Sequence, residues 1–147
     1  MGTEKGWVEK RQHQRVVATV KVDYKLVDPK DSKKVLEHVD YKNTTVEQMP
    51  ALEHKSVLYH AVTKDISLGG LALLGDREFP IGSVVEIGLH LPRYESVLKF
   101  LAKVVRTESF IEMGRTIHRA GVQTIAINRD DLEKIEKYII DLAKSNR

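Results

Sequence analysis

The stretch Asp65-Ile66-Ser67-Leu68-Gly69-Gly70-Leu71-Ala72-Leu73 decides the fold class, because it joins one strand to another through a tight turn. Residues two apart in a strand face the same side, so Asp65 and Ser67 share one face while Ile66 and Leu68 point to the core. Gly69 and Gly70 permit the turn and a close approach to the backbone. The carboxylate and hydroxyl can bind a ligand edge, or they can simply satisfy backbone groups of the turn.

Short strands separated by turns extend on both sides of this stretch. Alternating or continuous apolar residues cover residues 16–27, 57–66, 71–74, 84–91, 97–107 and 117–127. Proline-containing segments such as Asp28-Pro29 and Phe79-Pro80 mark turns between them. This pattern predicts an antiparallel sandwich or a small barrel.

The hydrophobic period changes after Asn128. Leu132, Ile135, Ile139 and Leu142 recur at helical spacing and form one apolar stripe. Asn128 is a candidate N-cap, and acidic residues fill the first turn, where the helix dipole favours them. We expect a helix over residues 129–145 that plugs one end of the barrel. The alternative is a helix whose stripe seats a partner chain.

The length of 147 residues fits one domain. We divide residues 1–147 into an N-terminal arm (1–15), the strands, an insertion (28–56) and the C-terminal helix (129–145). The insertion is polar, contains Pro50 and is too long for a plain loop, so it is expected to form a helix or a hairpin.

Composition excludes several classes of protein. The chain has no cysteine, which rules out a disulfide framework, a thiol nucleophile, a zinc finger and an iron–sulfur cluster. It has no apolar run of the length that a membrane span or a signal core requires. Its net charge of +3 permits an anionic ligand without requiring a nucleic acid polymer. We therefore expect a cytoplasmic protein with no membrane insertion and no nucleic acid polymer as partner.

The motifs of common enzyme classes are missing. The sequence contains no phosphate-binding loop, no dinucleotide-binding glycine motif and no nucleophile elbow. Its six histidines lack the spacing of metal ligands, although a metal site assembled from distant residues is the less favoured alternative. No carboxylate pair lies in an apolar setting suited to acid–base chemistry. The chain is expected to be no enzyme and to use no metal or cofactor.

A second motif, Arg11-Gln12-His13-Gln14-Arg15, lies just before the first expected strand. Two guanidinium groups four residues apart can hold one ligand, and the planar fork of arginine suits phosphate and the O6/N7 edge of guanine. Together with Lys10, these arginines form a basic cluster. Such a cluster is as typical of a solvent-exposed basic arm as of a binding site for an anion. By chance, roughly one chain in a hundred or fewer would contain both motifs in this order. Their joint occurrence therefore favours a shared function.

Together these motifs resemble those of the PilZ domain family, the bacterial receptor module for cyclic di-GMP. The resemblance is carried by Arg11, Arg15, Asp65, Ser67 and Gly70, and by the segments 69–73, 79–85, 103–106 and 120–123. It extends from about residue 10 to the final helix and leaves residues 28–56 unmatched. The chain departs from the family in this long insertion, which would be a partner surface or would partly cover the site. It also has Thr124 where the family often has an aromatic residue.

The resemblance implies a mainly β fold, namely a six-stranded antiparallel barrel with a C-terminal helix and an inserted segment after the first strand. It also implies a ligand site where the N-terminal arm folds over the barrel. Arg11 and Arg15 would hold the phosphates and one guanine edge. Asp65 and Ser67 would hold the other guanine or its ribose, and Gly70 would leave room for the ligand.

The leading hypothesis is a non-catalytic cyclic di-GMP effector whose arm orders over the barrel and changes the surface offered to a protein partner. Lys10 would favour a stacked pair of ligand molecules, and Gly69 would bring the backbone close to the ligand. One alternative is a ligand-independent PilZ-like interaction scaffold that uses residues 28–56 or the helix. Another is a barrel that binds single-stranded nucleic acid, which the low aromatic content of 6% disfavours.

Overall fold

The computed structural model describes residues 15–28 and 57–145 of the chain. The regular elements in these ranges are seven strands and one helix. Their bounds are β1 (Val16–Val17), β2 (Lys21–Leu26), β3 (Tyr59–Ser67), β4 (Gly70–Gly75), β5 (Val84–Leu89), β6 (Leu98–Glu112), β7 (Arg115–Ala126) and α3 (Arg129–Ser145). Lys10, Arg11 and residues 29–56 of the expected insertion lie outside the described residues.

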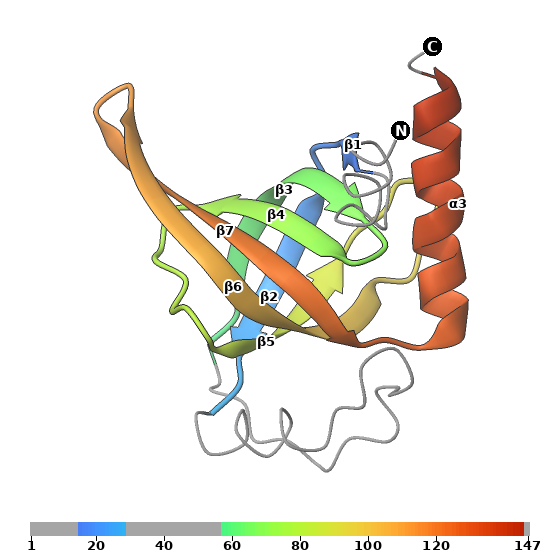
Figure 1. Cartoon of the computed structure of the whole chain (residues 1–147), viewed down its shortest axis with the longest axis horizontal. Coiled ribbons are helices and arrows are strands. Elements are labelled where there is room, and N and C mark those ends of the chain that lie inside the picture. The colour runs from blue at the N-terminus through green and yellow to red at the C-terminus, as the bar shows by residue number, and fades with distance from the viewer. Residues whose placement is uncertain (1–14, 29–56, 146–147) are drawn as a thin grey trace, which may run out of the picture.

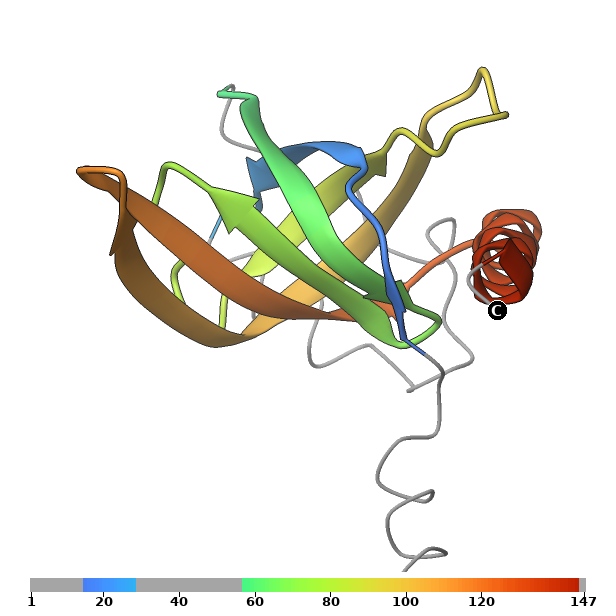
Figure 2. The same ribbon diagram turned by 90° about the horizontal axis from the view of Figure 1, so that it is seen from above.

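Six of the strands close into an antiparallel barrel (Figure 1 and Figure 2). Hydrogen-bonded neighbours follow the order β3-β2-β5-β6-β7-β4, and β4 pairs with β3 to complete the ring. The seventh strand, β1, is a two-residue addition that pairs with β3. The expected six-stranded barrel with a C-terminal helix is therefore confirmed.

The chain between β1 and β2 departs from the single strand expected over residues 16–27. Both strands pair with β3, one after the other. Between them, the hydroxyl of Thr63 accepts a hydrogen bond from the backbone N–H of Val20 at 2.9 Å and donates one to the carbonyl of Ala18. Thr63 is only 1% exposed. Backbone hydrogen bonds to β3 continue on either side, from the N–H of Ala18 to the carbonyl of Lys64 at 3.2 Å and from the N–H of Thr63 to the carbonyl of Val20 at 2.9 Å. The buried hydroxyl therefore interrupts the regular pairing only at the N–H of Val20 and the carbonyl of Ala18.

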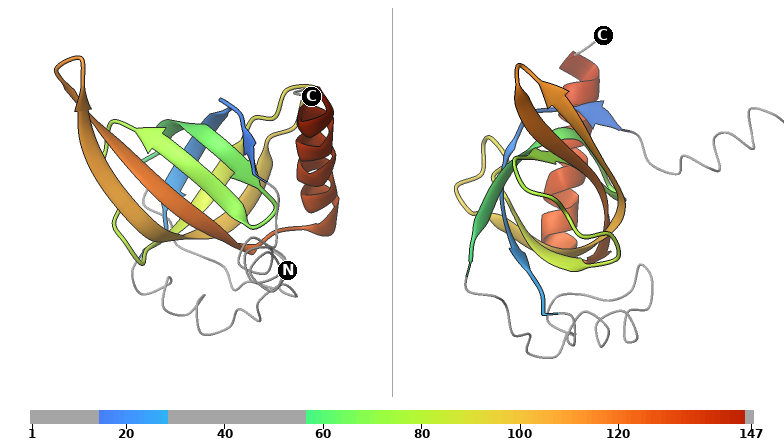
Figure 3. Two further views of the ribbon diagram at one scale, coloured as in Figure 1. Left: turned by 45° about the horizontal axis from the view of Figure 1, so that its top comes forward. Right: turned by 90° about the vertical axis from the view of Figure 1, so that its left-hand side faces the viewer.

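The core fills the barrel and continues to the helix. Phe79 and Phe100 are the largest fully buried side chains of the barrel, and α3 contributes Ile135 and Ile139 to the same apolar cluster. In the right-hand view of Figure 3, which looks along the barrel, α3 stands behind its opening. The apolar stripe is therefore occupied within the chain, as expected of a helix that closes one end of the barrel.

The helix begins directly after Asn128, as the sequence indicated, but the side chain of Asn128 does not cap it. The carbonyl of Asn128 accepts a hydrogen bond from the backbone N–H of Leu132 at 2.9 Å. The side-chain Oδ1 of Asn128 is buried and has no hydrogen-bond partner among residues 15–28 and 57–145. The N-cap residue is therefore held by its backbone rather than by its side chain.

Candidate functional site

The end of β3 and the turn that follows it position the acidic motif. Ile66 is fully buried, so its neighbours Asp65 and Ser67 emerge on the outer face of the barrel. The side chain of Asp65 is 18% exposed. The hydroxyl of Ser67 donates a hydrogen bond to the carbonyl of Gly70 at 3.3 Å across the turn. A carboxylate and a hydroxyl thus lie side by side on the surface, and the hydroxyl also supports the turn.

Arg15 lies directly before β1 and reaches the same place. Its Nη1 lies 3.7 Å from Oδ1 of Asp65, and its side chain is 51% exposed. The strand register explains this contact. Val17 in β1 is paired with Asp65 in β3, and Arg15 lies two residues before Val17 in the chain. A long ion pair with a half-exposed arginine contributes little to stability, so the guanidinium group is available to an incoming anion. The structure therefore brings Arg15 together with Asp65 and Ser67, while Lys10 and Arg11 lie outside the described residues.

The two glycines of the motif hold β4 against β7. A Cβ added to Gly70 would lie 2.0 Å from the carbonyl oxygen of Val122, which is too close for any side chain. The carbonyl of Gly69 accepts a hydrogen bond from the backbone N–H of Thr124 at 3.0 Å. Strand pairing therefore requires Gly70 whether or not a ligand binds beside it.

The surface beside Asp65 contains further residues that the sequence reasoning did not assign to a site. Residues paired directly across antiparallel strands share a face, and two such rows cross β3, β4, β7 and β6. One row is Asp65, Ala72, Gly121 and Arg106, and the other is Ser67, Gly70, Gln123 and Lys103. We call these two rows the outer wall. Segments 103–106 and 120–123 resembled family strands, but only the pairing register places their residues next to Asp65.

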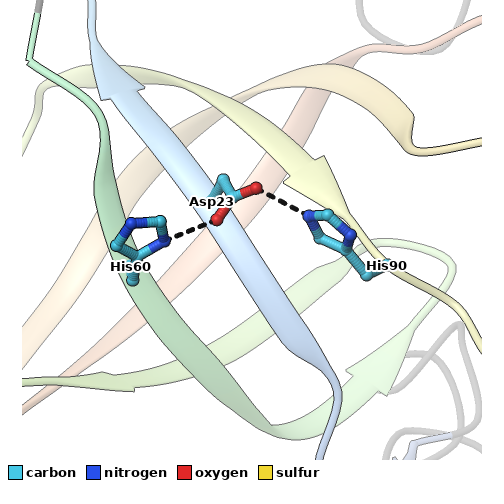
Figure 4. A network of polar contacts seen from close by, with 3 residues as sticks. All are labelled: Asp23, His60 and His90. Atoms are coloured by element: carbon cyan, nitrogen blue, oxygen red, sulfur yellow. Dashed lines mark hydrogen bonds and ion pairs between the residues drawn. The ribbon is translucent and has the colours of Figure 1, made fainter.

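A second polar cluster lies at the start of β3, on the outer surface of β2. Nδ1 of His60 lies 2.7 Å from Oδ1 of Asp23, and Nε2 of His90 lies 2.7 Å from Oδ2 of the same carboxylate (Figure 4). Partial burial raises the pKa of Asp23, but the hydrogen bonds to His90 and His60 outweigh burial and hold this pKa below its usual value. The cluster ties three neighbouring segments together, and no described group of His, Asp or Glu is arranged to hold a metal ion.

Comparison with known proteins agrees with this architecture. The model of the PilZ domain family matches residues 9–141. The structure is similar to the PilZ domain of YcgR from Escherichia coli with c-di-GMP, at 14% identity and a TM-score of 0.58, covering 94% of this chain and 95% of that one. It is also similar to the inhibitor of motility MotI/DgrA of Bacillus subtilis, at 17% identity and a TM-score of 0.62, covering 93% of this chain and 53% of that one.

A third similar structure is the PlzA protein of Borreliella burgdorferi in complex with c-di-GMP, at 7% identity and a TM-score of 0.53, covering 99% of this chain and 58% of that one. At such low identities these likenesses show the fold, and the chain spans little more than half the length of MotI/DgrA and PlzA. No curated protein sequence matches the chain. Among the described residues, no helix combines the length and apolar character needed to cross a bilayer.

Proposed function

The chain belongs to the PilZ domain family, and on this premise we propose that it is a non-catalytic receptor for cyclic di-GMP. The similar domain of YcgR was solved with this ligand, and so was PlzA. The observation that carries the proposal is the contact of Arg15 with Asp65 at 3.7 Å. It joins two motifs separated by 50 positions in the sequence on one face of the barrel.

The chemistry of this face suits a guanine-containing dianion. Arginine donates two parallel hydrogen bonds to a phosphate or to the O6/N7 edge of guanine. The carboxylate of Asp65 accepts hydrogen bonds from the N–H groups of a guanine, and the hydroxyl of Ser67 donates or accepts beside it. In this proposal Arg11 and Lys10 add positive charge from the arm, Gly69 offers its backbone, and Gly70 leaves the surface open.

Ligand binding would act through the arm. The Arg15–Asp65 contact is long, at 3.7 Å, and the side chain of Arg15 is half-exposed, so a phosphate can compete for the guanidinium group. A ligand shifts a conformational equilibrium only by its difference in affinity for the two states. We infer that bound cyclic di-GMP fixes the arm carrying Arg11 and Arg15 over the barrel and so changes the surface that a protein partner meets. The absence of cysteine fits a cytoplasmic site of action.

Calorimetric titration of variants tests this function. Arg15→Ala is expected to abolish binding of cyclic di-GMP, and Asp65→Ala to weaken it strongly. Arg93→Ala is the matched control, because Arg93 also forms an exposed ion pair, with Asp141 of α3 at 3.0 Å. Wild-type affinity in Arg15→Ala or Asp65→Ala would refute the site, and an equal loss in Arg93→Ala would reduce it to a general charge effect.

A further inference from the structure

The outer wall runs from acceptor groups at one side to cations at the other. Asp65 and Ser67 mark its β3 side, and Arg106 and Lys103 mark its β6 side. Neighbouring strands are about 4.8 Å apart, so three strand spacings separate the backbones of the two sides by roughly 14 Å along the curved sheet. The guanidinium group of Arg106 reaches back over Gly121 on β7, so it lies nearer to Asp65 than this backbone spacing. A dinucleotide lying across the strands can therefore contact both sides.

The middle of the outer wall is made of small residues. Ala72 and Gly121 lie between Asp65 and Arg106 in one row, and Gly70 follows Ser67 in the other. Ala72 belongs to the outward face, since its neighbours Leu71 and Leu73 belong to the core cluster. No long side chain therefore stands on β4 between the two sides.

A β-bulge turns Arg106 onto this face. The register of β6 against β7 shifts between Val104 and Arg106, which leaves Val105 as the extra residue. Val104 is fully buried, whereas Val105 and Arg106 are both exposed. Strict alternation would have pointed Arg106 inward with Val104, so the bulge is what exposes the guanidinium group.

The guanidinium group of Arg106 lies over Gly121. A Cβ added to Gly121 would lie 3.2 Å from Nη2 and 3.3 Å from Nε of Arg106. Arg106 forms no ion pair with any residue in the described ranges. A planar, exposed cation held above a glycine can stack on an aromatic ring or bind a planar polar edge.

We propose that Arg106 forms the far side of the cyclic di-GMP site by stacking on the guanine that is remote from Asp65. Lys103 lies beside it, and Gly121, which has no side chain, leaves room for the guanidinium group. This inference rests on the proposed function and adds the β6 side of the outer wall to the site. Stacking of a guanidinium group on a base contributes enough for Arg106→Ala to weaken binding about tenfold. Arg106→Lys keeps the charge but loses the planar group, so it should remain several-fold weaker than wild type.

Titration of cyclic di-GMP into five versions of the chain tests the inference: wild type, Arg106→Ala, Arg106→Lys, Gly121→Ala and Lys99→Ala. Gly121→Ala should also weaken binding, because its methyl group would lie only 3.2 Å from Nη2 of Arg106 and would push the guanidinium group out of its position. It should leave the barrel folded, since only a flexible side chain must shift. Lys99→Ala removes an exposed cation from the same strand, where Lys99 is paired with Gly88 rather than with the outer wall, and should bind like wild type.

The outcomes separate the two proposals. Wild-type affinity in Arg106→Ala overturns this inference and leaves the proposed function standing. Full rescue by Arg106→Lys, or an equal loss in Lys99→Ala, also overturns it, because charge alone would then explain the effect. A wild-type chain that binds no cyclic di-GMP overturns both proposals. Thermal unfolding of each variant distinguishes a loss of binding from a loss of fold.

Discussion

Replacing Thr63 with valine tests how the segment that follows Arg15 is held to the barrel. Valine has nearly the shape of threonine, so the change leaves the packing and removes only the hydroxyl. The backbone N–H of Val20 and the carbonyl of Ala18 then lose their partner inside the protein. Each unsatisfied buried group costs about 1–3 kcal/mol, and we expect a loss of about 3 kcal/mol in the free energy of unfolding. For a chain of this size that corresponds to a fall of about 6–12 °C in Tm.

The matched control is Thr63→Ser, which keeps both hydrogen bonds and deletes one methyl group. It should cost about 1 kcal/mol. Urea unfolding followed by circular dichroism measures both variants. Because Arg15 directly precedes β1, Thr63→Val should also weaken cyclic di-GMP binding at temperatures where the barrel is folded. A Thr63→Val chain as stable as wild type, or a Thr63→Ser chain that loses equally much, would refute the reasoning.

Three further predictions concern backbone packing and pH. Gly70→Ala should cost at least about 3 kcal/mol, because its methyl group would meet the carbonyl oxygen of Val122 at 2.0 Å and force β4 from β7; chemical unfolding measures this, and a wild-type midpoint would contradict it. The lowered pKa of Asp23 stabilises the fold above the ordinary value of 3.8, and this contribution is lost as pH falls through the folded pKa. Asp23→Asn should therefore give a flatter dependence of the unfolding midpoint on pH between about 5 and 2. Burial, with the charges of neighbouring groups, raises the pKa of Tyr24 to about 12, so the fold should lose stability as pH rises from 10 to 12. Tyr24→Phe should lose less over this interval, and equal alkaline losses in the two chains would exclude Tyr24 as the cause.

Much of the fold follows from local periodicity. Alternation around Ile66 predicted a strand that exposes Asp65 and Ser67, and the structure has this strand as β3. The helical stripe predicted α3 with its observed bounds. Both signals are local, since each depends on residues within a few positions of one another.

The remaining features depend on contacts between distant residues. Thr63 interrupts the first strand through hydrogen bonds more than 40 positions away, with Ala18 and Val20. The clash that requires Gly70 is with Val122, on a strand that follows much later. Arg106 belongs to the outer wall only because a bulge shifts the register of β6. Single-sequence periodicity contains no information on these pairings, which is why the sequence located one side of the candidate site and not the other.

Calorimetric titration of cyclic di-GMP into the unaltered chain, with GTP and cyclic di-AMP as controls, tests the central claim most directly. We predict selective binding of cyclic di-GMP in the micromolar range or tighter, and the stoichiometry will distinguish one ligand molecule from a stacked pair. The absence of both heat and a thermal shift at high ligand concentration would contradict this prediction. The barrel would then be better explained as an interaction scaffold that keeps the glycines of the motif for strand pairing alone.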